Sequence, residues 1–228
     1  MRVVSLVPSA TETLLAWGVT PVGVTRFCDC PGVPAVGGTK DPDPVAVAAL
    51  EPDLVVVCDE ENRREDAETL AGAGLRLHVV RIRAVADVEA ELGALAAAVG
   101  VGAPAPSLPP AAPEVVLRAF VPIWRRPWMT LSDDTYGASV LRHVGIADIF
   151  GDAPERYPQV SLADAAARRP DVVLAPSEPY PFGERHRAEL EQVGPVVAVD
   201  GRDLFWWGAR TGAALRRLAG LAAPVRRR

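Results

Sequence analysis

Residues 50–56 read Leu-Glu-Pro-Asp-Leu-Val-Val, and residues 169–174 read Arg-Pro-Asp-Val-Val-Leu. In both stretches a proline ends a helix, and the aspartate after it turns the chain into an apolar run with the length of a buried strand. Helices that lead into such strands are typical of βαβ units with a mainly parallel sheet. The repeated phrase therefore predicts two α/β halves that share one layout.

Strands and helices alternate on either side of these two stretches. The predicted strands are residues 2–7, 22–24, 54–57, 75–80, 115–121, 172–175 and 196–199. The predicted helices are about residues 9–18, 62–71, 86–99, 135–144, 184–192 and 211–221. Ser9 is the expected N-cap of the first helix, where Glu12 completes a capping box and Gly18 ends the helix.

A proline-rich stretch separates the two halves. Five of the thirteen residues from 101 to 113 are proline, which forbids a continuous helix and favours an extended spacer. We therefore predict an N-terminal α/β lobe over residues 1–100, a linker over 101–113 and a C-terminal α/β lobe over 114–228. Each lobe is expected to be Rossmann-like.

Composition excludes several classes of protein. The net charge of −5 leaves no basic excess for a nucleic-acid partner, and no apolar run is long enough to span a membrane. The first apolar run, residues 3–7, is too short for the core of a signal peptide, so the chain as written is expected in the cytoplasm. Three cysteines make an odd number, which argues against a disulfide framework.

Several motifs resemble one known family. Residues 2–12 read Arg-Val-Val-Ser-Leu-Val-Pro-Ser-Ala-Thr-Glu, and residues 205–210 read Phe-Trp-Trp-Gly-Ala-Arg. Further matches follow in order at residues 21–25, 36–40, 51–56, 60–63, 157–161, 170–174 and 177–182. In these stretches the chain resembles the class III, helical-backbone substrate-binding proteins of ABC importers, which include cobalamin-binding and ferric-siderophore-binding proteins. The resemblance implies two lobes with a ligand cleft between them.

The chain also differs from that family. The proline-rich linker stands where the family has a long backbone helix, and the export signal of importer-linked members is missing. The first of the family's two acids for docking an ABC permease falls near Arg64, beside Glu65, and the second is not evident. The resemblance thus implies either an importer's binding protein with a permease partner or a cytosolic derivative of one.

Polar and aromatic side chains follow the predicted strands, where the ligand site of an open α/β sheet is expected. The tryptophans would be flat walls for a corrinoid, haem or another ferric chelate, with packing in the core as the alternative. Glu60, Glu61 and Asn62 would turn into the cleft or, alternatively, cap the next helix. The expected ligand-binding residues are Phe27, Cys28, Lys40, Glu60, Glu61, Asn62, Trp124, Trp128, Glu178, Tyr180, Phe205, Trp206, Trp207 and Arg210.

The alternative function is that of a cytosolic enzyme or a metal-handling protein that has recruited the binding-protein fold. Cys28, Cys30 and Glu178 would bring soft and hard ligands to a transition metal, although the cysteine spacing is not that of a zinc knuckle. The sequence holds no Ser-His-Asp order, nucleophile elbow, phosphate loop or dinucleotide fingerprint. We therefore expect a ligand-binding protein that requires no cofactor, and we assign no catalytic residue.

Overall fold

The computed structural model describes residues 1–102 and 106–226 and contains two compact units. Each unit includes a short piece from the other half of the chain. Unit 1 comprises Met1–Ile82, Ala86–Pro106 and Trp207–Ala209, and unit 2 comprises Arg83–Val85, Ser107–Trp206 and Arg210–Arg228. The lobe boundaries at residues 100 and 114 stay a prediction, because residues 103–105 of the expected linker lie outside the described residues.

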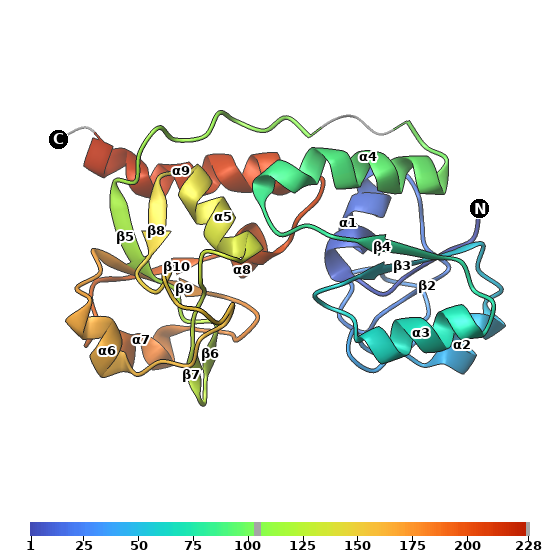
Figure 1. Ribbon diagram of the computed structural model, residues 1–228, viewed down its shortest axis with the longest axis horizontal. Helices are drawn as coiled ribbons and strands as arrows, with labels where there is room; N and C mark the ends of the chain where they lie inside the picture. The colour runs from blue at the N-terminus through green and yellow to red at the C-terminus, as the bar shows by residue number, and fades with distance from the viewer. Residues whose placement is uncertain (103–105, 227–228) are drawn as a thin grey trace. The chain divides into compact units, whose positions relative to one another are not determined.

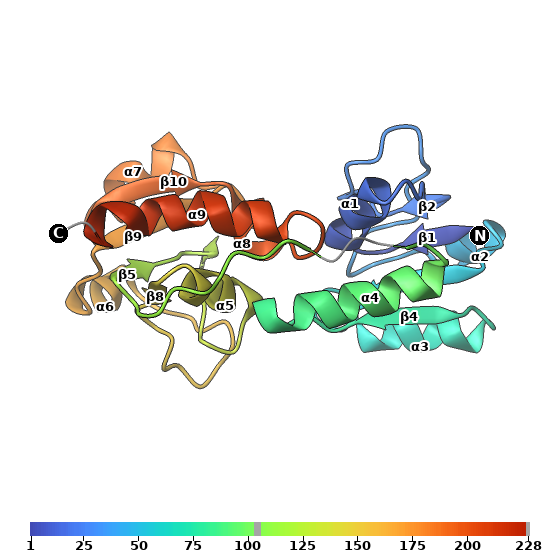
Figure 2. The same cartoon turned by 90° about the horizontal axis from the view of Figure 1, so that it is seen from above.

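Unit 1 is a parallel sheet between two layers of helices (Figure 1). Helices α1 and α4 lie on one face of the sheet and α2 and α3 on the other, as the view from above also shows (Figure 2). Its elements are β1 (Val3–Ser5), α1 (Pro8–Ala16), β2 (Gly23–Val24), α2 (Pro44–Ala49), β3 (Leu54–Cys58), α3 (Arg64–Gly72), β4 (Leu77–Val80) and α4 (Val88–Val99), the last preceded by a 3-10 turn, Val85–Asp87.

Unit 2 has a second parallel sheet and one antiparallel hairpin, β6–β7. Helices α5, α8 and α9 pack together on one face of the sheet. Helices α6 and α7 pack on the apolar core at its other face. Its elements are β5 (Leu117–Phe120), β6 (Trp124–Arg125), β7 (Trp128–Met129), α5 (Tyr136–His143), β8 (Ile146–Asp148), α6 (Leu162–Ala167), β9 (Val172–Pro176), α7 (Glu184–Leu190), β10 (Val196–Val199), α8 (Gly201–Phe205) and α9 (Thr211–Arg226).

The two sheets have the same strand order. Unit 1 has β2-β1-β3-β4, and unit 2, read from its other edge, has β8-β5-β9-β10. In each sheet the first strand along the chain is central, and the chain then builds outward on both sides of it. The predicted α/β class with mainly parallel sheets and a repeated layout is therefore confirmed.

The repeated Pro-Asp phrase makes the same contact in both units. The carboxylate of Asp53 accepts the backbone N–H of Arg2 at 2.6 Å, and that of Asp171 accepts the backbone N–H of Arg118 at 2.7 Å. Each aspartate also donates its own N–H to the carbonyl of the same arginine. We call this pair of contacts the Asp clasp. It fixes the register between the central strand and its neighbour at their amino ends.

Two boundary predictions are wrong in detail. Helix α1 begins at Pro8 with Val7 at the N-cap and no side-chain cap, so Ser9 and Glu12 do not form the expected capping box. A proline at the first helical position has no N–H to satisfy and a preset φ angle, which starts the helix one residue earlier. Helix α3 begins at Arg64 rather than at residue 62.

Part of the expected linker is bound to unit 2. His143 Nε2 lies 2.8 Å from the carbonyl of Pro109, and the N–H of Ala112 donates to the carbonyl of His143 at 2.7 Å. The guanidinium of Arg216 donates to the carbonyl of Ser107 at 2.9 Å. In the described part of the linker no helix is present, and residues 107–112 are held by α5 and α9.

The Asp clasp predicts a matched pair of stability effects. We expect Asp53→Ala and Asp171→Ala each to lower the free energy of unfolding by about 1–2 kcal/mol, because each leaves a strand N–H without its charged acceptor. Asp53→Asn and Asp171→Asn keep an acceptor oxygen and are the controls. Urea unfolding measures all four; alanine variants no less stable than the asparagine variants would contradict this role.

Candidate functional site

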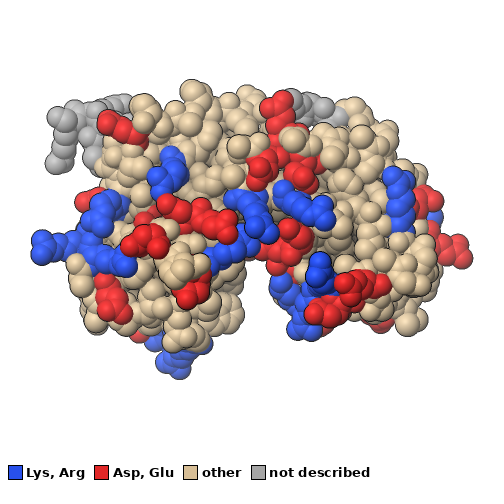
Figure 3. Space-filling view, viewed as in Figure 1, with Lys and Arg blue, Asp and Glu red and all other residues tan. Residues whose placement is uncertain are grey.

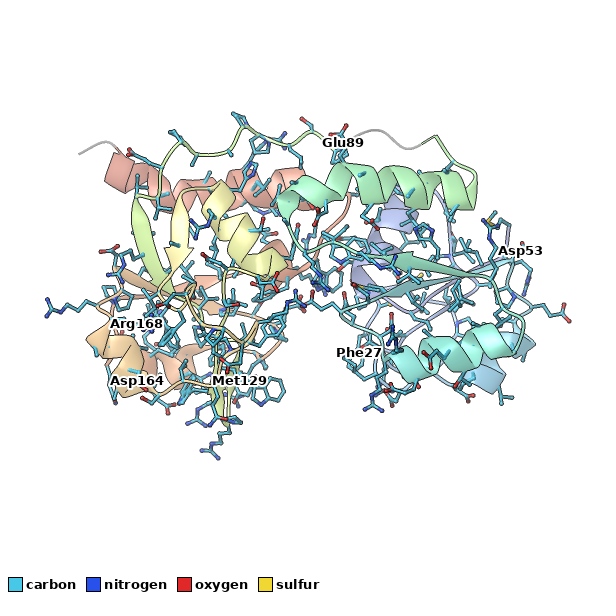
Figure 4. All side chains as sticks on the ribbon, in the orientation of Figure 1. Phe27, Asp53, Glu89, Met129, Asp164 and Arg168 are labelled. Carbon is cyan, nitrogen blue, oxygen red and sulfur yellow. The ribbon has the colours of Figure 1, made fainter. Side chains whose placement is uncertain are left out.

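The strand order creates a topological switch point at the carboxyl end of each sheet. In both units the chain departs in opposite directions from two adjacent strands, β1 and β3 in unit 1 and β5 and β9 in unit 2. Such a topological switch point is where open α/β sheets bind ligands. In Figure 4, Phe27 and Asp53 mark opposite ends of unit 1, so the Asp clasp and the predicted ligand residues lie at different ends of the sheet.

Asn62 ties together the strand ends at the switch point of unit 1. Its Oδ1 accepts the N–H of Cys58 at 2.8 Å, and its Nδ2 donates to the carbonyls of Leu6 at 3.2 Å and Thr39 at 2.9 Å. The residue is buried. Both ends of its amide are occupied by backbone groups, which favours a structural role over ligand contact.

The loop after β2 presents an aromatic ring and two thiols. Phe27 is 55% exposed, with the Arg26 guanidinium 4.9 Å from its ring centroid. The Cys28 sulfur lies 3.2 Å from each of the hydroxyls of Thr11 and Thr25. All three cysteines are free thiols, and burial raises the pKa of the Cys30 thiol.

Three further predicted ligand residues lie near the carboxyl end of β3. The ammonium group of Lys40 donates to the carbonyl of Glu60 at 2.8 Å, which joins two loops at this edge. Glu60 and Glu61 are partly exposed. Both precede α3, whose N-cap residue is Arg63.

The predicted metal ligands do not form a cluster in either unit taken alone. Within residues 1–102 and 106–226, no group of three or more His, Cys, Asp or Glu side chains is placed to hold a metal ion. Cys28 and Cys30 lie in unit 1, and Glu178 lies in unit 2. Metal binding by these residues stays a prediction.

An aromatic cluster lies on the segments that follow β5 and β9, the two switch-point strands of unit 2. Trp124, on the hairpin after β5, meets the ring of Tyr180 edge to face at 5.5 Å. Trp128, on the returning strand, stacks nearly parallel on Phe182 at 5.8 Å. Trp124 is 44% exposed, so part of its ring faces solvent. The hairpin is marked by Met129 in Figure 4 and is the lowest, basic point of unit 2 in Figure 3.

A second cluster in unit 2 joins a carboxyl group, an indole and two guanidinium groups. The guanidinium carbons of Arg202 and Arg210 lie 4.6 and 5.7 Å from the ring centroid of Trp206. Burial raises the pKa of the Glu178 carboxyl against the attraction of the two arginines and a hydrogen bond from the side chain of Trp206. Its Oε1 is buried and has no protein partner among the described residues.

A close approach of two backbone segments brings these groups together. The N–H of Gly201 donates to the hydroxyl of Ser177 at 3.0 Å. A Cβ atom at position 201 would lie 2.4 Å from the carbonyl oxygen of Glu178, so only glycine fits there. The loop after β9 and the start of α8 are therefore held against one another, with Glu178 beside Trp206.

Phe205 and Trp207, two further predicted ligand residues beside Trp206, differ in exposure. Phe205 is partly buried, and its ring is next to Gly137 of α5. Trp207 is only 3% exposed and belongs to unit 1, where the N–H of Ala209 donates to the hydroxyl of Thr13 at 3.2 Å. The burial of Trp207 favours packing, the alternative that sequence analysis left open, over ligand contact.

A shallow pocket of about 600 Å³ lies beside the hairpin in unit 2. Arg125 and Glu189 form an ion pair on its wall at 2.9 Å. Of the predicted ligand residues only Trp128 lines it; its other lining residues are Arg125, Arg126, Pro127, Gln159, Val160, Ser161, Leu162 and Glu189.

Two residues that complete the clusters of unit 2 were not predicted from the sequence, Arg202 and Phe182. Arg202 lies within the short helix α8, whose five residues are too few to give a helical period. Asp200, the N-cap of this helix, accepts the N–H of Arg202 at 2.9 Å. The sequence signal that could have indicated this helix is the pair Asp200-Gly201, which stands directly before Arg202.

Curated relatives of the chain are vitamin B12-binding proteins. The chain is 26% identical to one from Salmonella choleraesuis (strain SC-B67) over 196 residues, which cover 76% of this chain and 71% of that protein. It is 24% identical to one from Pectobacterium carotovorum subsp. carotovorum (strain PC1) over 243 residues, which cover 94% and 84%. No protein-family model matches the chain.

Solved structures have the same fold. The periplasmic vitamin B12 binding protein of Vibrio cholerae superposes with a TM-score of 0.79 at 19% identity, over all of this chain and 98% of that one. A periplasmic haem-binding protein in complex with two haems gives a TM-score of 0.79 at 20% identity, over 98% of both chains.

The fold is that of a two-unit α/β binding protein with parallel sheets. Together with the curated relatives, it confirms the resemblance stated above: the chain is a relative of the class III substrate-binding proteins of ABC importers. The relatives named here are binding proteins, so the comparisons give no support to a cytosolic enzyme. Within the described residues, no helix has the length and apolar character needed to cross a membrane.

The two adjacent tryptophans are expected to respond differently to truncation. Trp207→Ala should lower the free energy of unfolding by about 3–5 kcal/mol, the usual cost of removing a buried aromatic side chain. Trp206→Ala should cost about 1 kcal/mol, because the ring is only partly buried. Denaturant unfolding of both variants measures the difference, and equal losses would show that both rings are core residues.

Proposed function

We propose that the chain binds a flat metal chelate, a corrinoid or a haem, at the carboxyl-end loops of its sheets. The observation that carries the proposal is the cluster of Glu178, Trp206, Arg202 and Arg210 at the switch point of unit 2. A large ring system needs apolar contact area, and its polar substituents need fixed partners at the rim. This cluster and the adjacent pair Trp124–Tyr180 offer both.

The polar groups suit the substituents that such chelates carry. A corrinoid has amide side chains and a haem has two propionates, so both present acceptors for guanidinium N–H groups. Glu178 Oε1 is buried and has no protein partner among the described residues, so it can accept an N–H of an amide substituent. Trp206 and Tyr180 add contact area with few rotatable bonds.

Unit 1 contributes an exposed ring and a soft donor. Phe27 would add to the apolar surface, and Lys40 would face polar substituents. The Cys28 thiol could approach a chelated metal as an axial ligand. Glu60 and Glu61 remain candidates, whereas the occupied amide of Asn62 makes it a support for the loops.

A permease of an ABC importer is the partner that this function implies. A vitamin B12-binding protein and a haem-binding protein with this fold are periplasmic, so we group this chain with them and not with cytosolic enzymes. Glu65, in the first turn of α3, is the exposed acid that we propose for docking in unit 1. No resident cofactor is part of the proposal.

Titration calorimetry tests the proposed ligand. We expect cyanocobalamin, haemin or both to bind the full chain with a dissociation constant in the micromolar range or tighter. Trp206→Ala should weaken binding at least about tenfold, or about 1.4 kcal/mol, because it removes the ring and the hydrogen bond to Glu178.

Two variants serve as controls for that titration. Trp17→Phe changes a tryptophan at the end of α1, away from the carboxyl-end loops, and should leave the affinity unchanged. Arg202→Lys keeps the charge but loses the planar stack on Trp206, so it should weaken binding by less than Trp206→Ala. Absence of heat with both chelates and with a ferric siderophore would refute the proposal.

A further inference from the structure

The loop after β2 carries two thiol groups that are two residues apart. Cys28 and Cys30 are both free and partly exposed, whereas Cys58, the third cysteine of the chain, is buried at the end of β3. The proposed chelate site uses Cys28 at most as an axial ligand, and it leaves Cys30 without a role.

Backbone hydrogen bonds fold this loop around the two cysteines. The N–H of Cys28 donates to the carbonyl of Thr25 at 3.0 Å, and the N–H of Val33 donates to the carbonyl of Cys30 at 3.3 Å. Between these two contacts, the N–H of Cys30 donates to the carbonyl of Cys28 at 3.1 Å and closes a three-residue turn. Such a turn brings its first and third residues closer together than an extended chain does, and here both are cysteines.

Two hydroxyl groups hold the sulfur of Cys28. Oγ1 of Thr11, on α1, and Oγ1 of Thr25, which follows β2, each lie 3.2 Å from it. Oγ1 of Thr25 accepts the N–H of Phe27 at 3.3 Å, so its own proton is available for the sulfur. A hydroxyl that donates to a sulfur stabilises the thiolate, which is the form that binds metals, and it fixes the direction of that ligand.

The charges beside the two thiols suit a cation. The residue between them is an exposed acid, Asp29. Burial raises the pKa of the Cys30 thiol, and the negative charges of Cys28 and Asp29 add to this effect. Arg26, the neighbouring cation, is already paired with Asp41 at 2.9 Å. A positive ion held by both sulfur atoms would therefore remove a repulsion between two thiolates.

We propose that Cys28 and Cys30 bind one monovalent copper ion through their two sulfur atoms. This site goes beyond the proposed function and lies within unit 1, so it needs no ligand from Glu178 in unit 2. On binding, each thiol releases its proton to water and forms one bond from sulfur to copper, and no electron is transferred. Thr11 and Thr25 orient the Cys28 ligand.

The number of ligands selects the ion. Thiolates favour soft ions, among them Cu(I), zinc and iron in iron–sulfur clusters. Structural zinc sites and iron–sulfur clusters take four protein ligands. In the described ranges 1–102 and 106–226, no third His, Cys, Asp or Glu side chain joins the two thiols to hold a metal. Monovalent copper forms stable linear complexes with two thiolates, so it is the ion that this pair satisfies.

Competition for Cu(I) with the coloured chelator bicinchoninate tests the proposal. The full chain, reduced, desalted and kept under argon with ascorbate, should take one equivalent of Cu(I) from the chelator. Cys28→Ser and Cys30→Ser should each weaken binding at least about a hundredfold, because outer partners alone are worth tenfold to a hundredfold. Thr25→Val, which removes one such partner, should weaken it about tenfold.

Cys58→Ala is the matched control, because it removes a thiol that is buried outside the loop. It should leave the uptake at one equivalent. No uptake by the reduced wild type, or uptake that survives in Cys30→Ser, would overturn the proposal. X-ray absorption at the copper edge should show two sulfur neighbours, and three or more would mean a copper cluster shared between chains and would also overturn it.

Two variants separate this inference from the proposed function. Trp206→Ala should lose affinity for cyanocobalamin or haemin and still take up one equivalent of Cu(I). Cys30→Ser should lose Cu(I) and keep the wild-type affinity for the chelate, because it retains Cys28. If no chelate binds to the wild type, the proposed function fails, while the copper titration still decides whether the two thiols form a metal site.

Discussion

The Asp clasp is the contact on which the arrangement of both sheets depends. A carboxylate at the start of the third strand holds the N–H of an arginine at the start of the central strand, once in each unit. A slip of one residue would turn every inward side chain of a strand outward, so register must be fixed wherever a strand is buried. The clasp lies at the amino ends of the strands. The loops at the carboxyl ends are therefore not needed to fix the register and can carry other side chains.

Those loops are supported in different ways in the two units. In unit 1 a single buried amide, that of Asn62, connects three backbone segments. In unit 2, Gly201 lies so close to Glu178 that it has no space for a Cβ atom. The buried carboxyl group of Asp148 accepts the N–H of Val121, which precedes the β6–β7 hairpin. These two contacts support the loops of unit 2. Ligand-binding side chains need such support, because a loosely held side chain loses binding energy to conformational entropy.

Much of the fold could be predicted from the sequence, and much less of the site. The Pro-Asp phrase indicated both third strands correctly because helix end, turn and apolar run lie within seven residues. The hairpin was missed because its two strands have two residues each, joined by an arginine and a proline. The partners of Asn62 could not be foreseen, since the carbonyl of Leu6 is 56 residues away. For the same reason, the sequence could not show that Trp207 is buried while Trp206 stays partly exposed.

The charges around Trp206 support the proposal that this cluster contacts a ligand. Arg217 binds Asp203 through two contacts of 2.6 Å, so the negative charge of Asp203 is already matched. Nη2 of Arg210 lies 3.7 Å from Oδ1 of the same carboxylate, which is too far for a hydrogen bond. The Arg210 side chain is 16% exposed. A guanidinium has five N–H donors, so Arg210 can take an additional acceptor beside this carboxylate. The carboxylate or amide oxygen of a chelate substituent is such an acceptor, and Trp206 lies beside it as the apolar surface for the ring.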